Sequence, residues 1–146
     1  MLHKGELDAS LLALVTRDST ATVLLVEDFE GWRYQERELL RAHPEWEIIS
    51  EACDGAEGVR KATELQPDII LLDVGLPILN GIETARRIRQ RSPQTHIVFV
   101  TQDGDRDIRD AALSINGTRY VLKSNAATEL LPAIAAALAD RYSAAL

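Results

Sequence analysis

The stretch DIILLDV (68–74) decides the fold, because its apolar residues follow one another without interruption until Asp73. A continuous apolar run is typical of a strand that is covered on both faces within a parallel sheet. The chain has four more short apolar runs, at 22–28, 46–52, 96–101 and 119–124. Four of the five runs are nearly continuous, so we expect five strands in one parallel sheet.

The segments between these runs have helical periodicity. The clearest example has the spacing i, i+3, i+4, i+7 and consists of Ile108, Ala111, Ala112 and Ile115. Pro44 is expected to close the first helix, and RSPQ (91–94) the third. Alternating strands and helices predict an α/β fold with right-handed crossovers. We expect a flavodoxin-like, doubly wound five-stranded parallel sheet of order 2-1-3-4-5 with helices on both faces.

The composition excludes several classes of function. The 16 Lys and Arg against 23 Asp and Glu give a formal charge of −7, which repels nucleic acid, so direct nucleic-acid binding is not expected. The densest basic stretch, within 86–91, is interpreted as a solvated helix face. The single Cys53 cannot form an internal disulfide, and no segment has the length and apolarity of a membrane span or signal peptide. These features predict a cytoplasmic protein without a membrane partner.

The 146 residues are enough for one domain with a substantial core. We expect this domain over residues 21–146. Residues 1–20 exceed what the fold needs and are interpreted as an N-terminal extension. A short amphipathic helix there could present Leu7, Leu11, Leu14 and Val15 on one face.

Polar side chains close four of the expected strands at the same end. They are Glu27, Asp28, Asp73, Thr101 and Lys123. Ligands bind at this end of open parallel sheets, where strands one and three of the order 2-1-3-4-5 are neighbours. Taken singly, Asp28 could be a helix cap and Lys123 a surface lysine. Five such side chains at one edge instead favour a functional site.

Three crowded carboxylates repel one another and need a cation. Mg²⁺ prefers oxygen ligands and combines one or two carboxylates with phosphate oxygens. A carboxylate can also attack phosphorus and form an acyl phosphate. We therefore expect Mg²⁺-dependent phosphoryl transfer to Asp73, with Lys123 neutralising phosphoryl oxygens and the Thr101 hydroxyl bonding one of them.

From about residue 21 to residue 142 the chain resembles the response-regulator receiver family of two-component signalling. The segment IILLDVGLPILNGIE (69–83) is similar to its phosphorylation-site signature. Its acidic pair, hydroxyl and lysine positions are matched by VED (26–28), VFVT (98–101) and YVLK (120–123). The resemblance implies a phosphoacceptor signalling domain rather than an enzyme, closest to receivers that usually precede a helix-turn-helix output domain.

The resemblance also implies roles for individual residues. Asp73 would accept the phosphoryl group, and Mg²⁺ would be bound directly by Asp28 and Asp73, by the Gly75 carbonyl, and through water by Glu27. Lys123 would pair with the phosphoryl group.

Thr101 and Tyr120 would be the switch residues, although Tyr120 could also be an ordinary half-buried strand residue. The resemblance implies a sensor histidine kinase or phosphotransfer protein as donor and a downstream protein as partner. Output and a homodimer contact are expected on the fourth helix, fifth strand and fifth helix, roughly residues 105–142.

Three positions depart from the family pattern. Ser124 stands where proline is common, which puts a cis peptide there in doubt. Gln102 stands where a small residue is usual and could narrow the site, and NGTR (116–119) replaces a glycine-rich loop.

Two other functions stay open on the sequence alone. One is the receiver part of a DNA-binding regulator. The other is an Asp-nucleophile phosphatase, for which DFE (28–30) is a poor match to the expected D-x-D. A flavin site is a poorer match still, because the first loop is acidic where phosphate needs amide donors.

Overall fold

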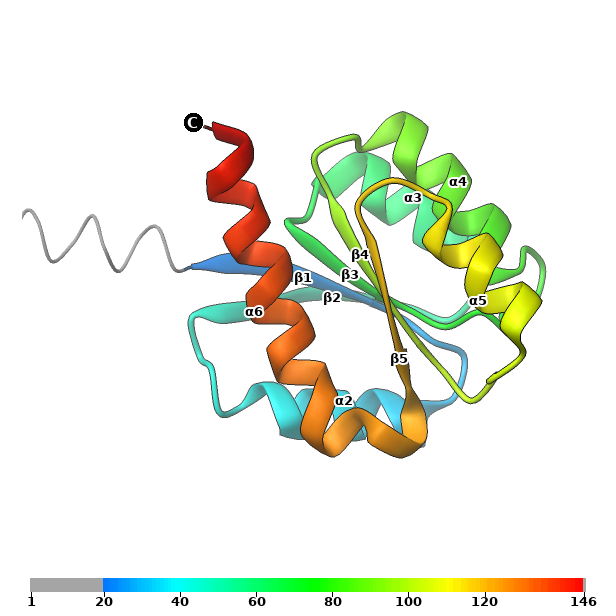
Figure 1. Ribbon diagram of the computed structural model, residues 1–146, viewed down its shortest axis with the longest axis horizontal. Coiled ribbons are helices and arrows are strands. Elements are labelled where there is room, and N and C mark those ends of the chain that lie inside the picture. Colours follow the sequence, from blue (N-terminus) through cyan, green and yellow to red (C-terminus); the bar gives the residue numbers. More distant parts are fainter. Residues whose placement is uncertain (1–19, 146) are drawn as a thin grey trace, which may run out of the picture.

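The computed structural model describes residues 20–145 and contains one five-stranded parallel sheet of order β2-β1-β3-β4-β5 (Figure 1). The strands are β1 (Ala21–Val26), β2 (Trp46–Ala52), β3 (Ile69–Leu72), β4 (His96–Thr101) and β5 (Thr118–Leu122). The helices are α2 (Glu30–Leu40), α3 (Gly55–Leu65), α4 (Gly81–Arg91), α5 (Arg106–Leu113) and α6 (Ala126–Ala145), with a short 3-10 turn, η2 (Lys123–Asn125). The predicted fold class and strand order are confirmed.

Two apolar cores fill the spaces on either side of the sheet. Helices α2 and α6 cover one face, and α3, α4 and α5 cover the other (Figure 1). Leu25 and Leu71 point into the first core, whereas Leu24 and Leu72 point into the second. This alternation explains the unbroken apolar runs, because both faces of β1 and β3 are buried.

Strands β1, β3 and β5 end before the polar residues that the sequence placed at their ends, whereas β4 includes Thr101. Val26 of β1 lies opposite Leu72 of β3, so the next residues of both strands leave the sheet side by side. Backbone hydrogen bonds fix them there: Glu27 N donates to Ala52 O at 3.0 Å, and Asp73 N donates to Val26 O at 3.1 Å. The expected strands were therefore too long at this edge, and the carboxylates lie in the loops beyond it.

The loop after β3 is held in place by a close backbone approach. A Cβ on Gly81 would lie 2.1 Å from the carbonyl oxygen of Asp73, so only glycine fits at the start of α4. Asn80 caps this helix by accepting a hydrogen bond from Glu83 N at 3.0 Å. Asp73 is thus held between the end of β3 and the first turn of α4.

The first and third expected helices end where the sequence predicted. Helix α2 ends at Leu40, ahead of Pro44, and α4 ends at Arg91, as predicted. The amphipathic helix expected within residues 1–20 falls on residues that lie outside the described part of the chain. Among the described helices, none combines the length and the apolarity needed to cross a membrane.

Candidate functional site

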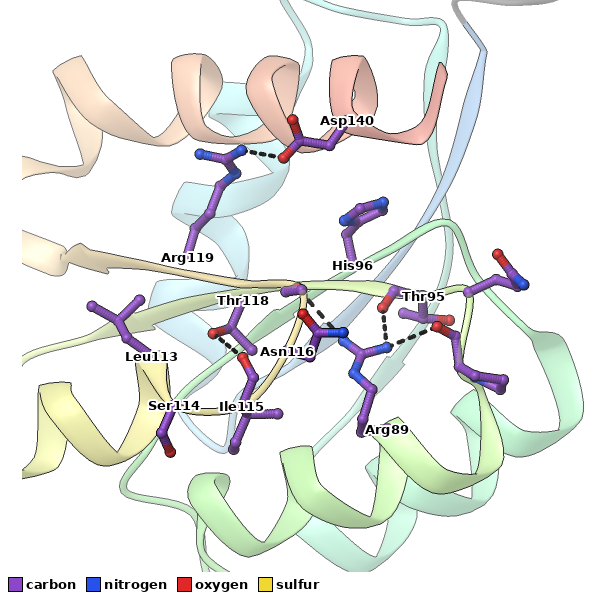
Figure 2. A pocket seen from close by; sticks show the side chains of 13 residues that line it. Arg89, Thr95, His96, Leu113, Ser114, Ile115, Asn116, Thr118, Arg119 and Asp140 are labelled. Atoms are coloured by element: carbon purple, nitrogen blue, oxygen red, sulfur yellow. Dashed lines mark hydrogen bonds and ion pairs between the residues drawn. The ribbon is translucent and has the colours of Figure 1, made fainter. Parts of the chain in front are cut away.

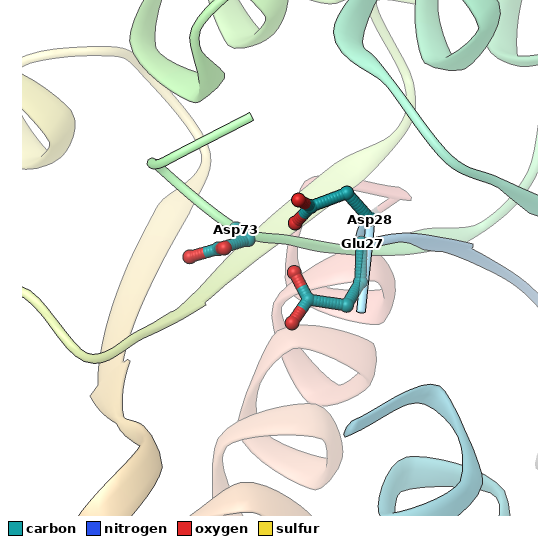
Figure 3. Close-up of side chains that lie close together, drawn as sticks. All are labelled: Glu27, Asp28 and Asp73. Carbon is teal, nitrogen blue, oxygen red and sulfur yellow. The ribbon is translucent and has the colours of Figure 1, made fainter. Parts of the chain in front are cut away.

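Three carboxylates meet at the carboxyl edge of the sheet (Figure 3). Glu27 and Asp28 follow β1, and Asp73 follows the neighbouring β3. One oxygen from each residue lies within 4.8 Å of the others. Glu27 is 2% exposed and Asp73 is 9% exposed, whereas Asp28 faces solvent. The structure therefore brings together the carboxylates that the sequence placed at one edge.

Lys123 adds a cation to this cluster. It opens the η2 turn directly after β5. Its Nζ lies 2.5 Å from Glu27 Oε1 and 3.7 Å from Asp73 Oδ2. Its side chain is 10% exposed, so this charge is screened little by water. Lys123 is thus bound to Glu27 while lying within ion-pair distance of the expected acceptor.

The electrostatics of Glu27 fit a metal site. Burial raises the pKa of Glu27 to about 7, and Asp73 adds to the rise, while the Lys123 ammonium opposes it. Its second oxygen, Oε2, is buried without a hydrogen-bond partner among the described residues. An open carboxylate oxygen beside two further carboxylates is a donor set suited to a hard divalent cation. The residues present therefore fit Mg²⁺.

Thr101 and Tyr120 both form a hydrogen bond with the backbone of Asp103. Thr101 ends β4 and is 2% exposed, and its hydroxyl oxygen accepts a hydrogen bond from Asp103 N at 3.2 Å. The Tyr120 hydroxyl donates to the carbonyl of the same residue. Tyr120 is half-buried in β5, with its ring centroid 6.2 Å from that of Phe99. The sequence indicated both switch candidates but not that they bind the backbone of the same residue.

The site opens into a cavity of about 530 Å³. Its lining includes all three carboxylates, Thr101 and Lys123, together with Gly75, Phe29, Gln102 and Asp103. Phe29 is 66% exposed and stands at the rim; the sequence reasoning did not single it out. Gln102 is also exposed at this rim, where the sequence placed it.

A buried cluster on α2 was missed by the sequence reasoning. The Trp32 ring centroid lies 5.2 Å from Lys123 Nζ, and Glu36, one turn further along, is 1% exposed. Burial raises the pKa of Glu36 to about 8, and the negative charge of Glu27 adds to the rise. The available signal was spacing: Trp32, Glu36 and Leu40 follow one another at intervals of four, which puts an acid in an apolar helix stripe.

A second hollow, of about 630 Å³, lies at the opposite end of β4 and β5 (Figure 2). Its central cation, Arg89, donates to the carbonyls of Pro93 and Thr95 at 3.1 and 2.8 Å. Arg119 pairs with Asp140 at 2.5 Å. These guanidinium groups are occupied in joining α4 and α6 to the sheet, so the hollow is a structural junction. The interpretation of 86–91 as a solvated face is wrong for Arg89.

The structure shows the conformation or contacts of two segments that depart from the family pattern. Residues 20–145 contain no cis peptide bond, so Ser124 follows Lys123 through an ordinary trans peptide. Arg119, from the NGTR segment, is directed toward α6 through its pair with Asp140. Cys53 is exposed and carries a free thiol.

Comparison with known proteins agrees with this geometry. Residues 23–135 match the family model of the response regulator receiver domain. The chain is 38% identical to the transcriptional regulatory protein LiaR of Bacillus subtilis over 115 residues, which cover 79% of this chain and 54% of LiaR. It is 31% identical to the nitrate/nitrite response regulator protein NarL of Escherichia coli over 120 residues, covering 82% of this chain and 56% of NarL. The chain thus spans about half the length of these curated relatives.

Solved structures show the same fold. A LuxR-family two-component response regulator from Aurantimonas superposes with a TM-score of 0.79 at 36% identity, covering 84% of this chain and 88% of that one. The response regulator domain of Thermotoga maritima CheB superposes with a TM-score of 0.75 at 29% identity, covering 82% and 96%. The chain belongs to the response regulator receiver domain family of two-component signalling proteins.

Proposed function

We propose that this domain, over residues 21–146, accepts a phosphoryl group on Asp73 from a phosphohistidine donor and thereby switches a partner-binding face. One observation carries the proposal: Asp73 lies within 4.8 Å of two further carboxylates and 3.7 Å from Lys123 Nζ, at the open edge of the sheet. A nucleophile with both a cation site and a fixed ammonium beside it has what phosphoryl transfer requires.

The transfer step forms one bond and breaks one. A carboxylate oxygen of Asp73 attacks phosphorus as the P–N bond to the donor histidine breaks, and the electron pair remains on the ring nitrogen. Lys123 neutralises a phosphoryl oxygen, for which its Nζ has to leave Glu27. Thr101 can donate its hydroxyl proton to another oxygen once the group is present. The protein thus contributes position and charge rather than further covalent chemistry.

The metal site would be formed by Asp28, Asp73 and the Gly75 carbonyl, with Glu27 acting through water. Bound Mg²⁺ supplies positive charge for the phosphoryl oxygens and for the crowded carboxylates. Glu27 would contact the metal through water, in keeping with the 2.5 Å contact that one of its oxygens makes to Lys123 Nζ before transfer.

Incubation of the purified chain with a small acyl phosphate donor and Mg²⁺ tests the proposal. We expect the intact mass to increase by one phosphoryl group, and the increase to disappear in excess chelator. The absence of any mass change with Mg²⁺, in a chain shown to be folded, would exclude the phosphoacceptor function. Steady turnover of phosphate esters would instead favour the phosphatase alternative.

Asp28→Ala is expected to weaken Mg²⁺ binding more than Glu27→Ala. Asp28 faces solvent beside Asp73, whereas Glu27 is already paired with Lys123 at 2.5 Å. We expect a loss of about tenfold in affinity for Asp28→Ala, which corresponds to about 1.4 kcal/mol, and a smaller loss for Glu27→Ala. Calorimetric titration with MgCl₂ measures both, and equal losses would contradict the assigned roles.

Phosphorylation is expected to be read on α5, β5 and α6, roughly residues 105–142. Thr101 accepts from the N–H of Asp103 and Tyr120 donates to the carbonyl of the same residue, so movement of the threonine hydroxyl toward a phosphoryl oxygen releases one of these two bonds. Hydrogen bonds to charged groups contribute about 1.5–3 kcal/mol each, and a shift from about 1:99 to 99:1 needs about 5.5 kcal/mol. Two or three such bonds suffice.

Thr101→Ala is therefore expected to accept phosphate at Asp73 yet show weakened amide chemical-shift changes across residues 105–123. Thr95→Ala, which removes a buried hydroxyl at the other end of β4, serves as the matched control. Wild-type shift changes around Tyr120 in fully phosphorylated Thr101→Ala would place the output on another surface.

The receiver part of a DNA-binding regulator is the second candidate. The observation favouring it is that LiaR is described as a transcriptional regulatory protein and extends to nearly twice the matched length. Sequencing the gene beyond the codon for Leu146 distinguishes the two, because a basic helix-turn-helix segment in frame would assign the chain to such a regulator.

A further inference from the structure

Helix α2 buries two polar groups that its packing does not require. Glu36 is 1% exposed and stands one turn after Trp32 and one turn before Leu40, which belongs to the core under α6. In the described part of the chain, neither Trp32 Nε1 nor Glu36 Oε1 has a hydrogen-bond partner. Burying unpaired polar groups destabilises a fold, and an apolar residue would fill the same place.

The Trp32 indole of this pair lies next to Lys123, the lysine of the proposed site. Lys123 Nζ lies over the Trp32 ring, 5.2 Å from its centroid, while 2.5 Å from Glu27 Oε1 and 3.7 Å from Asp73 Oδ2. The face of an indole ring is electronegative and attracts an ammonium group, more strongly when both are desolvated. At 10% exposure, Lys123 meets that condition.

Resting on the proposed function, we propose that Trp32 and Glu36 are positioning residues for Lys123. The indole face holds the ammonium beside Asp73, and the Glu36 carboxyl orients the indole through its N–H. Residues four apart on a helix are neighbours, so a small side-chain rotation brings Trp32 Nε1 and Glu36 Oε1 into hydrogen-bond geometry.

The charge state of Glu36 fits this role. Burial raises its pKa to about 8, so its carboxyl is largely neutral near pH 7, and the nearby indole N–H acts in the opposite direction. A neutral carboxyl keeps an acceptor oxygen for the indole without drawing Lys123 away from Asp73. The role therefore requires an acceptor at position 36 and not a charge, which Glu36→Gln preserves and Glu36→Leu does not.

A spectroscopic measurement follows the contact in the unsubstituted chain. The chain has two tryptophans, so the indole N–H signal of Trp32 is assigned by its loss in Trp32→Phe. On addition of Mg²⁺ and beryllofluoride, an analogue of the phosphoryl group, Lys123 moves toward the fluorides and this signal is expected to shift. Lys123→Met should abolish the shift. An unmoved Trp32 signal in wild type, with beryllofluoride binding verified by fluorine NMR, overturns the proposal.

Phosphorylation rates with a saturating small acyl phosphate donor provide the second test. We expect Trp32→Leu and Glu36→Leu to be about fivefold slower, Trp32→Phe to lie between Trp32→Leu and wild type, and Glu36→Gln to stay within about twofold of wild type. The Mg²⁺ concentration for half-maximal rate should stay unchanged throughout, because no metal ligand is altered. Thermal unfolding verifies that each variant is folded. Should a leucine variant fail to fold, Trp32→Phe, which keeps an aromatic face, and Glu36→Gln, which keeps side-chain size, still test the proposal.

A purely structural role would give a different pattern. It would make the rate follow thermal stability, with Phe and Leu at position 32 alike and Gln at position 36 no better than Leu. That pattern, or wild-type rates in Trp32→Leu, overturns the positioning role while leaving phosphorylation of Asp73 intact. A wild-type chain that takes up no phosphoryl group would instead refute the proposed function itself.

Discussion

Asp73→Asn is expected to take up no phosphoryl group from an acyl phosphate donor in the presence of Mg²⁺. The carboxylate oxygen of Asp73 is the nucleophile of the proposed transfer, and an amide oxygen at the same place is a far weaker one. Asp73 belongs to the carboxylate cluster and lies 3.7 Å from Lys123 Nζ, whereas Glu27 is already paired with that ammonium at 2.5 Å. Intact-mass measurement of the variant should show one unmodified species at all donor concentrations.

The variant is expected to remain folded, so loss of labelling reports chemistry. Asparagine is nearly isosteric with aspartate, the backbone bond from position 73 to Val26 O does not involve the side chain, and the change removes one of three crowded negative charges. Asp103→Asn, in the lining of the same cavity, is the matched control and should be labelled like wild type. An unchanged mass increase in Asp73→Asn, or labelling transferred to a neighbouring residue at the wild-type rate, would contradict the assignment.

The parts of the fold that follow from local pattern could be predicted from sequence. Unbroken apolar runs indicated buried parallel strands. Their alternation with helices indicated a sheet of order 2-1-3-4-5, in which β1 and β3 are neighbours. That order alone predicts that Asp28 and Asp73, 45 residues apart in sequence, converge. The ends of the strands were predicted less well, because a polar residue can continue a strand or leave it, and only the pairing partner decides.

The parts that depend on distant side chains could not be predicted. Lys123 and Glu27 are 96 residues apart in sequence, and their ion pair joins the residue directly after β5 to the residue directly after β1. The backbone N–H and C=O of Asp103 are bound by side chains on two different strands, Thr101 of β4 and Tyr120 of β5. Arg89 looked like its solvated neighbours, yet it is half-buried and donates to backbone carbonyls. Burial of a charged side chain depends on which helix packs over it.

Glu36→Leu is expected to stabilise the metal-free protein by an amount that grows as pH rises from about 5 to about 8. The folded pKa of Glu36 is raised by burial to about 8 from an ordinary value of 4.5. Between these values the unfolded chain has lost the proton that the folded chain still holds. The free energy of unfolding of wild type therefore falls with rising pH, by up to about 1.4 kcal/mol per pH unit from this group. Leucine removes that loss and fills the apolar stripe.

Urea unfolding of wild type and Glu36→Leu across this pH range, in chelator, measures the effect. The difference between the two free energies of unfolding should be smallest near pH 5 and reach a few kcal/mol near pH 8. Wild type and variant share the smaller slope of Glu27, whose pKa is raised to about 7, so this slope cancels in the difference. Glu38→Leu, on the exposed side of α2, is the control for replacing a glutamate of this helix by leucine at a position outside the core. Parallel profiles for wild type and Glu36→Leu would mean that Glu36 is charged when folded. A variant that is more stable but accepts phosphate more slowly would show that Glu36 serves the site at a cost in the stability of the core.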